Sequence, residues 1–357
     1  MGEKLRRIAV LPGDGIGPEV IAEVVPLFDA LTRGGVGPFE AEVLDWGAGR
    51  LLATGEAMPA DGFDRLAKFD AILLGAYGDP RILDPDYLRR LLLAMRFELD
   101  LFANLRPVRC LEERLNPLKG VKANEIDLII VRENTEGMYS GAGGSVHVNT
   151  ADEVALQEMV VTSRGVERVV RVAFDLAGTR PRAKVTLVDK ANALPHAGAL
   201  WQRVFSQVAA EFPAVETEHL FADVAAMEMI RNPGRFDVLV TENLFGDILS
   251  DLAAMLGGGL GLAPSANLHP GRVSMFEPVH GSAPDIAGTG RANPMAAFAS
   301  LALLLRFLGE EDAARAIEWA IAAAVRAGKV TPDLGGVQAT GEVGREVRRK
   351  TLERLSA

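Results

Sequence analysis

Five short apolar runs rich in β-branched residues recur along the chain, and they restrict its fold more than any other feature. They are RIAVL, DAILLG, DLIIV, KVTLVD and FDVLVT. Helical periodicity follows most of them, as in PEVIAEVVPLFDAL and GALWQRVFSQVAAEF. Strands that alternate with helices predict an α/β protein with a largely parallel sheet. The length of 357 residues predicts about two domains, and the tail beyond Gly309 is predicted to form helices interrupted by TPDLGG.

The composition is that of an ordinary globular protein, with 48% apolar and 24% charged residues. A net charge of −10 argues against nucleic acid and anionic membrane as partners, although local arginines could still bind acidic small molecules. The single cysteine, Cys110, excludes a disulfide within the chain and a cysteine-rich metal centre. No signal-peptide core follows the N-terminus and no apolar run is long enough for a membrane span, so a cytoplasmic location is expected.

The first glycine-rich loop, in IAVLPGDGIGPEV, joins a predicted strand to a predicted helix. The dinucleotide-binding fingerprint needs a glycine where Pro18 stands, and no Gly-Lys-Ser/Thr is present for a P-loop. Neither common phosphate-binding loop is therefore predicted. A plain strand-to-helix turn, with Pro18 and Glu19 opening the helix, is enough to explain the segment.

Two carboxylates lie one turn apart in TENLFGDILSDLAAML, with no lysine or arginine among them. Like charges at that spacing cost a helix about 0.2–0.5 kcal/mol. A helical wheel places Ser250 and Ala254 beside Asp247 and Asp251, and it predicts an opposite, core-facing arc of Ile248, Leu249, Leu252, Ala253, Met255 and Leu256. The pair is either a solvated face or two oxygen ligands for Mg²⁺ or Mn²⁺.

Cationic side chains stand near the ends of predicted elements. Arg96 belongs to a helical pattern, Arg106 precedes a proline, and Arg132 ends a strand. Together they could hold a di- or tricarboxylate, whereas each alone is equally a surface ion-pair partner. Arg89, Leu92, Leu93 and Arg96 are expected to share one helical face. Lys190 follows a strand and is either a base beside a metal-bound hydroxyl or a surface lysine.

Two segments are predicted to be irregular. FEPVHGSAPDIAGTGRANP is expected to form a long ordered loop, in which Asp285 could bind a ribose 2′-hydroxyl and repel a 2′-phosphate. The glycine-rich residues 139–150 are predicted to form a loop or protruding hairpin. Zinc-binding H-E-x-x-H and the serine-hydrolase motif G-x-S-x-G are both missing from the sequence, which disfavours those two classes of enzyme.

Six segments, in this order, resemble the metal-dependent decarboxylating dehydrogenases of 2-hydroxy acids, which include isopropylmalate, isocitrate, homoisocitrate, tartrate and D-malate dehydrogenases. The segments are LPGDGIGPEV, DLFANLRP, VRENTEGMY, VDKANAL, RFDVLVTENLFGDILSDLA and FEPVHGSAPDIAG. The resemblance covers nearly the whole chain. It implies a two-domain, isopropylmalate-dehydrogenase-like α/β fold that is not a Rossmann fold, with the active site in a cleft.

The resemblance also implies a division of the chain and an assembly. Residues 1–103 with 257–357 would form a discontinuous NAD-binding domain. Residues 104–256 would form a smaller domain for substrate, metal and dimerisation, with 139–150 as an interlocking arm. The active unit would be a homodimer with shared active sites.

The roles that the resemblance implies are specific. Asp247 and Asp251, with Asp223 of the partner subunit, would hold Mg²⁺ or Mn²⁺. Arg96, Arg106 and Arg132 would bind substrate carboxylates. Lys190 would help to deprotonate the substrate hydroxyl as hydride passes to NAD⁺, and Tyr139 would protonate the enol left after CO₂ departs. The residues expected around NAD are His280, Gly281, Ser282, Ala283, Asp285, Ile286 and Asn293.

The substrate is predicted from two leucines. Leu92 and Leu93 stand one turn before Arg96, where this family recognises the group that varies between substrates, and they suit an isopropyl group better than a third carboxylate. The chain most resembles the actinobacterial isopropylmalate branch, which predicts oxidative decarboxylation of (2R,3S)-3-isopropylmalate to 4-methyl-2-oxopentanoate in leucine biosynthesis. D-malate or tartrate is the alternative substrate, and isocitrate or homoisocitrate is disfavoured. A non-catalytic subunit is disfavoured because all the catalytic groups are present.

Overall fold

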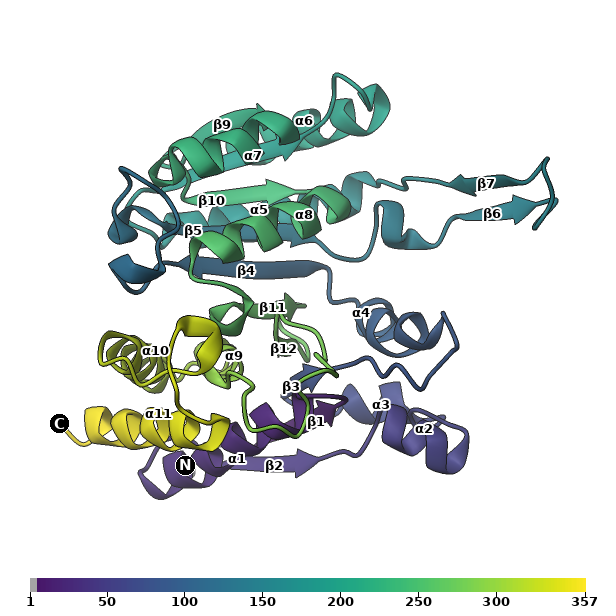
Figure 1. The fold of residues 1–357 in the computed structure, drawn as a ribbon. Helices are drawn as coiled ribbons and strands as arrows, with labels where there is room; N and C mark the ends of the chain where they lie inside the picture. The colour runs from purple at the N-terminus through teal and green to yellow at the C-terminus, as the bar shows by residue number, and fades with distance from the viewer. Residues whose placement is uncertain (1–4) are drawn as a thin grey trace. The chain divides into compact units, whose positions relative to one another are not determined.

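The computed structural model describes residues 5–357, which group into two compact units. Unit 1 comprises the described part of residues 1–101 together with 109–124 and 254–357. Unit 2 comprises residues 102–108 and 125–253. Figure 1 shows the elements of both units along the chain.

Unit 1 is built on five strands in the order β2-β1-β3-β12-β11. They are β1 (Arg6–Gly13), β2 (Phe39–Val43), β3 (Ala71–Ala76), β11 (Pro264–Leu268) and β12 (Met275–Pro278). β1 pairs in parallel with β2 and β3, β12 pairs in parallel with β3, and only β11 runs antiparallel to β12. Every residue of β3, AILLGA, is buried, as expected for a central strand covered on both faces.

The helices of unit 1 pack on this sheet and on one another. They are α1 (Gly17–Arg33), α2 (Ala48–Thr54), α3 (Gly62–Leu66), α4 (Ala94–Glu98), α9 (Met295–Phe307), α10 (Glu311–Arg326) and α11 (Thr340–Leu355). α9, MAAFASLALLLRF, is apolar almost all round, and it packs against β11 and β12 beneath α10. In residues 5–357 no helix combines the length and apolarity that a membrane crossing would need.

Unit 2 contains strands in the order β4-β5-β10-β8-β9. They are β4 (Ala103–Arg109), β5 (Asp127–Glu133), β8 (Lys184–Asp189), β9 (Glu216–Phe221) and β10 (Val238–Thr241). Its helices are α5 (Ser163–Gly178), α6 (Pro195–Ala209), α7 (Ala222–Arg231) and α8 (Asn243–Leu256), whose last turn belongs to unit 1. β5, β10, β8 and β9 pair in parallel, which confirms the predicted α/β class. Their carboxyl ends therefore meet at one edge of the sheet.

The core-facing arc predicted for α8 is correct for Leu249, Ala253 and Leu256, which are buried, and wrong at two positions. Ile248 and Met255 are 60% and 57% exposed, whereas Ser250 and Ala254 are buried. The packed face is thus rotated toward the small residues, because Ser250 and Ala254 allow closer packing than the larger side chains do. Two large apolar side chains of α8 consequently face solvent in the single chain.

Residues 109–124 group with unit 1, although the predicted division placed them with residues 104–256. The reason is local hydrogen bonding, since Arg114 donates to the carbonyl oxygens of Leu334 (2.8 Å) and Val325 (2.9 Å). The assignment of the two units as NAD-binding and substrate-binding domains stays a prediction.

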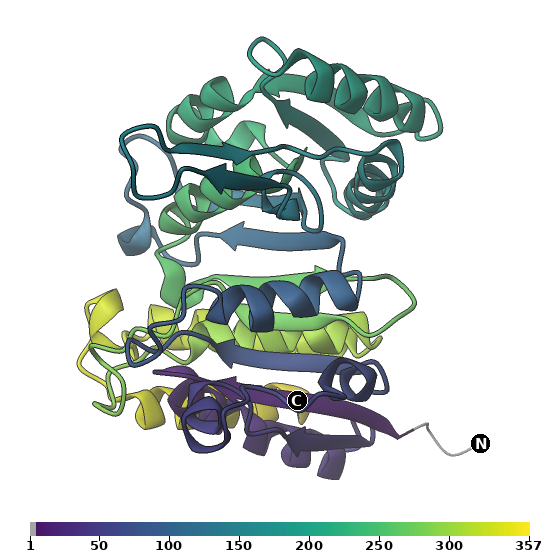
Figure 2. The ribbon, with the colours of Figure 1, turned by 90° about the vertical axis from the view of Figure 1, so that its right-hand side faces the viewer.

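A hairpin extends from unit 2, formed by β6 (Gly143–Val146) and β7 (Val154–Gln157) (Figure 1). The two strands pair in antiparallel register, and every residue in both is exposed. Figure 2 shows them side by side, turned toward the viewer. A hairpin is therefore present in this part of the chain, but its bounds differ from the predicted 139–150: it begins at Gly143, and its second strand ends at Gln157. We call residues 143–157 the hairpin arm.

The glycines of the first loop are required by close packing. Gly13 has φ +75°, and a Cβ there would lie 1.9 Å from the carbonyl oxygen of Ala76. Gly15 has φ +58°, and its Cβ would lie 2.0 Å from the carbonyl oxygen of Ser282. The backbone N–H of Ile16 donates to that same oxygen at 2.8 Å. The turn therefore brings β1, β3 and the loop after β12 into direct backbone contact.

We predict that Gly15→Ala destabilises the protein far more than Gly35→Ala does. Gly35 also has a left-handed φ, of +83°, but its Cβ would meet nothing within 4 Å, so only a backbone cost of about 1–2 kcal/mol is expected. Gly15→Ala adds a backbone clash and should lower the free energy of unfolding by a further ~2 kcal/mol or more. Urea unfolding of both variants measures this, and equal losses would contradict the packing argument.

Candidate active site

The parallel strands of unit 2 bring the predicted catalytic groups to one edge. Arg132 lies near the end of β5, Lys190 directly follows β8, and Asp223 lies in the first turn of α7 directly after β9. α8, which carries Asp247 and Asp251, begins two residues after β10. The alternation of strand and helix therefore places these side chains where ligands bind in α/β proteins.

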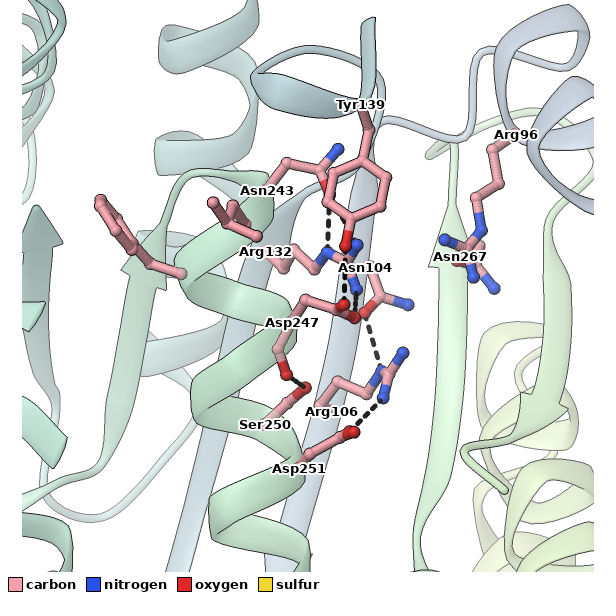
Figure 3. A network of polar contacts seen from close by, with 12 residues as sticks. Arg96, Asn104, Arg106, Arg132, Tyr139, Asn243, Asp247, Ser250, Asp251 and Asn267 are labelled. Atoms are coloured by element: carbon pink, nitrogen blue, oxygen red, sulfur yellow. Dashed lines mark hydrogen bonds and ion pairs between the residues drawn. The ribbon is translucent and has the colours of Figure 1, made fainter. Parts of the chain in front are cut away.

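Arg132 is the centre of the best-defined contacts at this edge (Figure 3). Its side chain is 2% exposed, and its Nε and Nη2 donate to Asn243 Oδ1 at 2.9 and 2.6 Å. Its Nη1 pairs with Asp247 Oδ1. The hydroxyl of Tyr139 donates to Asp247 Oδ2 at 2.8 Å, and the guanidinium lies 5.3 Å from the centre of the Tyr139 ring.

Arg106 makes a similar pairing one turn further along α8. Its Nη1 lies 3.6 Å from Asp251 Oδ1, and its Nε donates to Asn104 Oδ1 at 3.0 Å. Figure 3 shows both arginines reaching α8 from the neighbouring strands. Each carboxylate of the acidic pair thus has its own arginine, which compensates the repulsion that the sequence alone left unexplained.

The two carboxyl groups differ in acidity because of these contacts. Partial burial acts to raise the pKa of Asp247, but the charges of Arg132 and Arg106 and the Tyr139 hydrogen bond outweigh it and hold the pKa below its ordinary value. For Asp251, partial burial prevails, helped by the charge of Asp247, and the pKa is raised despite Arg106. Asp247 is therefore the more firmly ionised of the pair.

The donor set of α8 fits a hard divalent cation. Asp247 and Asp251 offer carboxylate oxygens, the ligand type that Mg²⁺ and Mn²⁺ take. Within residues 5–357 of one chain, no three His, Cys, Asp or Glu side chains lie close enough together to hold a metal ion. Asp223 is not grouped with the α8 pair, so the ligand set Asp223, Asp247 and Asp251 stays a prediction that needs a second chain.

Asp223 is paired with Lys190 of its own chain. Lys190 Nζ lies 2.6 Å from Asp223 Oδ1 and 5.9 Å from the centre of the Phe221 ring. The hydrogen bond from Lys190 holds the pKa of Asp223 below its ordinary value. The structure therefore brings together the two residues that were expected to serve a neighbouring subunit's site.

Arg96, Leu92 and Leu93 lie in unit 1. Arg96 is 7% exposed, its Nη2 donates to Glu277 Oε1 at 3.1 Å, and among the described residues its buried Nε has no partner. Leu92 and Leu93 lie in a π-helical turn, η1 (Arg89–Leu93), so the α-helical spacing that predicted a shared face with Arg89 does not apply there. Both leucines are half-buried and Arg89 is exposed. Turns of this kind often occur at functional sites.

The residues expected around NAD lie in the loop between β12 and α9, within unit 1. Ser282 contacts the first glycine loop as described, and Asn293 Nδ2 donates to Asp333 Oδ2 at 2.9 Å. Burial lowers the pKa of His280, and its buried Nε2 has no partner among residues 5–357. Asp285 is exposed. The remaining residues of this predicted set are Gly281, Ala283 and Ile286, and the backbone N–H of Ile286 donates to the carbonyl oxygen of Ala283 at 3.1 Å.

Sequence reasoning missed the amides that orient the arginines. Asn104 lies two residues before Arg106 on β4, and alternation along a strand puts both side chains on one face. Asn243 lies one turn before Asp247 on α8. The spacing in the sequence could therefore have predicted that Asn104 lies beside Arg106 and Asn243 beside Asp247.

Glu133 was also missed as a buried acid. It is 2% exposed, and its carboxylate accepts hydrogen bonds from the N–H groups of Thr135 and Glu136 and from the Thr135 hydroxyl. Burial raises its pKa to about 7, because these hydrogen bonds offset the loss of solvation only in part. Its carboxylate organises the turn that leads from Arg132 to Tyr139.

The chain is similar to known proteins over nearly its whole length. Residues 7–347 match the family model described as isocitrate/isopropylmalate dehydrogenase. The chain is 47% identical to 3-isopropylmalate dehydrogenase of Thermobifida fusca, with 99% of each chain covered. It is 51% identical to the enzyme of the same name from Rhodococcus erythropolis, over 89% of this chain and 93% of that one. A crystal structure of isocitrate dehydrogenase from Methylococcus capsulatus superposes with a TM-score of 0.88 at 38% identity, covering 97% of this chain and 99% of that chain.

We predict that Glu133 makes stability fall as pH rises. The pKa in the folded protein, about 7, exceeds the ordinary value of 4.5, so the folded state binds the extra proton between these values. The free energy of unfolding should therefore decrease through this window, by at most about 1.4 kcal/mol per pH unit, and then level off. Urea unfolding across that range should show this loss in the unmodified protein and not in Glu133→Gln. Parallel profiles for the two proteins would refute the assignment.

Proposed function

The chain belongs to the isocitrate/isopropylmalate dehydrogenase family and is a decarboxylating hydroxy-acid dehydrogenase, and we propose that its substrate is (2R,3S)-3-isopropylmalate. The product would be 4-methyl-2-oxopentanoate, formed with reduction of NAD⁺ in leucine biosynthesis. The observation that carries this proposal is the combination of near-full-length identity with the half-buried pair Leu92 and Leu93 beside Arg96. An apolar pair suits an isopropyl group and penalises a charged one.

The arginines are proposed to exchange partners when substrate binds. Arg132 and Arg106 are held by Asn243 and Asn104, and they are neutralised by the carboxylates of α8. Substrate carboxylates would take over the guanidinium groups and leave the oxygens of Asp247 and Asp251 available to Mg²⁺ or Mn²⁺. When bound, the cation would supply Lewis-acid polarisation of the substrate's hydroxyl and carboxylate oxygens.

Two side chains are proposed to move protons. Lys190 Nζ would accept the proton of the substrate hydroxyl while hydride leaves for NAD⁺, and Asp223 holds that amine in place at 2.6 Å. Tyr139 would donate its hydroxyl proton to the enol carbon after CO₂ leaves. The guanidinium of Arg132 near its ring favours the phenolate that this step produces.

NAD is proposed to bind along the loop between β12 and α9. His280, kept neutral by burial, offers an unpartnered Nε2 to an adenosine group. The exposed carboxylate of Asp285 would accept a ribose 2′-hydroxyl and repel a 2′-phosphate, which favours NAD over NADP.

A homodimer is proposed because one chain leaves apolar surface uncovered. Ile248 and Met255 of α8 are more than half exposed, and so is Met227 of α7, with Ile230 of the same helix at 45%. The hairpin arm adds further exposed apolar side chains, at Val146, Val154 and Leu156. Patches of this kind mark interfaces, and an isolated two-stranded hairpin gains little stability by itself. A second copy would supply Asp223 and Lys190 to each active site.

We predict that 3-isopropylmalate is the preferred substrate in a steady-state panel with D-malate, tartrate, isocitrate and homoisocitrate, each with NAD⁺ and Mg²⁺. The physical reason is that Leu92 and Leu93 bury the isopropyl group and offer no partner to a polar one. A higher kcat/KM for any other acid would refute the substrate assignment.

A double variant, Leu92→Ala with Leu93→Ala, tests the role of the two leucines directly, and D-malate serves as the control substrate. The double variant should lower kcat/KM for 3-isopropylmalate, by about 10–200-fold in all. Turnover of D-malate should change little, since malate has no group to fill that space. Equal effects on both substrates would show that the leucines do not determine specificity.

We predict that Asp251→Asn weakens Mn²⁺ binding more than Asn104→Asp does. The first change removes a proposed ligand, whereas the second changes a residue that contacts Arg106 and keeps the acidic pair. Titration calorimetry of the unliganded protein with Mn²⁺ gives the readout without turnover. Unchanged Mn²⁺ affinity in Asp251→Asn would remove the α8 pair from the metal site.

A further inference from the structure

Asp189, at the end of β8, is a buried carboxylate for which the proposed reaction has no use. It is 4% exposed, and three groups from different segments contact its carboxylate. Its Oδ1 accepts from the backbone N–H of Ala191 at 3.0 Å, and its Oδ2 accepts from Gln202 Nε2 of α6 at 2.8 Å. The Ala191 contact closes the turn that contains Lys190, so Asp189 fixes the backbone on which Lys190 is carried.

The third contact comes from His219 on β9, whose Nε2 lies 3.0 Å from Asp189 Oδ1. Asp189 is opposite Phe221 in the parallel register, so His219, two residues earlier, places its side chain on the same face of the sheet. The same Nε2 lies 3.5 Å from Gln202 Nε2, so the imidazole lies beside both the carboxylate of Asp189 and the amide that donates to it. The imidazole also packs edge-on against Phe221, at 5.4 Å between ring centres.

These contacts join β8 and β9, the two strands that precede Lys190 and Asp223. β8 leads directly to Lys190, and β9 leads through Phe221 to Asp223. Lys190 Nζ in turn lies near Asp223 and over the Phe221 ring. The charged and polar groups around Asp189 are His219 from β9, Gln202 from α6 and the turn of Lys190 itself.

We propose that His219 is a positioning residue, which acts through the carboxylate of Asp189 to hold Lys190 where its Nζ can accept the proton of the substrate hydroxyl. This inference rests on the proposed role of Lys190 as the base. His219 needs only to donate a hydrogen bond from Nε2, so a different side chain with a donor at that place should serve as well. Loss of the donor leaves a buried carboxylate short of a partner and loosens the turn.

The test compares His219→Ala with His219→Gln, whose amide nitrogen can take the place of Nε2. His219→Ala should lower kcat about 10- to 100-fold and leave KM for 3-isopropylmalate and for NAD⁺ nearly unchanged, because a small misplacement of a catalytic group affects the chemical step. His219→Gln should restore most of the kcat. Gln207→Ala, an exposed position on the same helix as Gln202, serves as the matched control and should behave as the unmodified enzyme.

Unchanged kcat in His219→Ala overturns the proposal, and so does a loss that His219→Gln shares fully. Mixed subunits give a second readout. Because Lys190 is proposed to serve the partner's site, an equal mixture of His219→Ala and Tyr139→Phe subunits should regain about a quarter of full activity, as should Lys190→Ala mixed with Tyr139→Phe. If activity is regained when Lys190→Ala is mixed with Tyr139→Phe but not when His219→Ala is, His219 does not act through Lys190 and the proposal is overturned. No recovery in either mixture instead refutes the shared site of the proposed function, and the kcat comparison then decides the role of His219.

Discussion

The pairing of two arginines with two aspartates along one side of α8 is the interaction on which the rest of the site depends. Arg132 and Arg106 are buried, and a buried cation is tolerated only when it is paired and hydrogen-bonded. Asp247 and Asp251 supply the charge, while Asn243 and Asn104 supply the remaining acceptors. The same four charged groups are the natural partners of a dicarboxylate and a divalent cation. An arrangement that is neutral by itself can therefore accept an anion and a cation together with little change in net charge.

Much of this architecture could be predicted from local pattern. The strands β1, β3, β5, β8 and β10 were predicted because short β-branched runs between helical segments are typical of buried parallel strands. Arg132 and Lys190 could be placed at one edge for the same reason, since parallel strands all end on the same side. Asp223 follows β9, which no such run predicted, so only the family resemblance pointed to it. The glycines of the first loop were recognised, but not the cause of their presence, because the carbonyl oxygens of Ala76 and Ser282 approach from distant parts of the chain.

What failed depended on three-dimensional packing. The wheel for α8 assumed that large apolar residues define the buried side, whereas Ser250 and Ala254 lie there and Ile248 and Met255 face solvent. Hydrophobic side chains that a second chain would cover look like core residues in one sequence. The π-helical turn at Leu92 and Leu93 was missed because a wheel assumes regular α-helical spacing. Segment 109–124 was assigned to the wrong unit because Arg114 bonds to carbonyl oxygens more than 200 positions away.

The hairpin arm has a consequence that reaches beyond its shape. Tyr139 lies in the short helical turn η4 (Met138–Ser140), four residues before β6 starts. The proposed general acid is therefore joined to the base of an element that has no hydrophobic core of its own. If the arm acquires its order by docking on another copy, mass action links the local concentration of chains to the placement of the phenol. Dilution would then inactivate the enzyme by disordering the hairpin arm, at concentrations where units 1 and 2 are still folded.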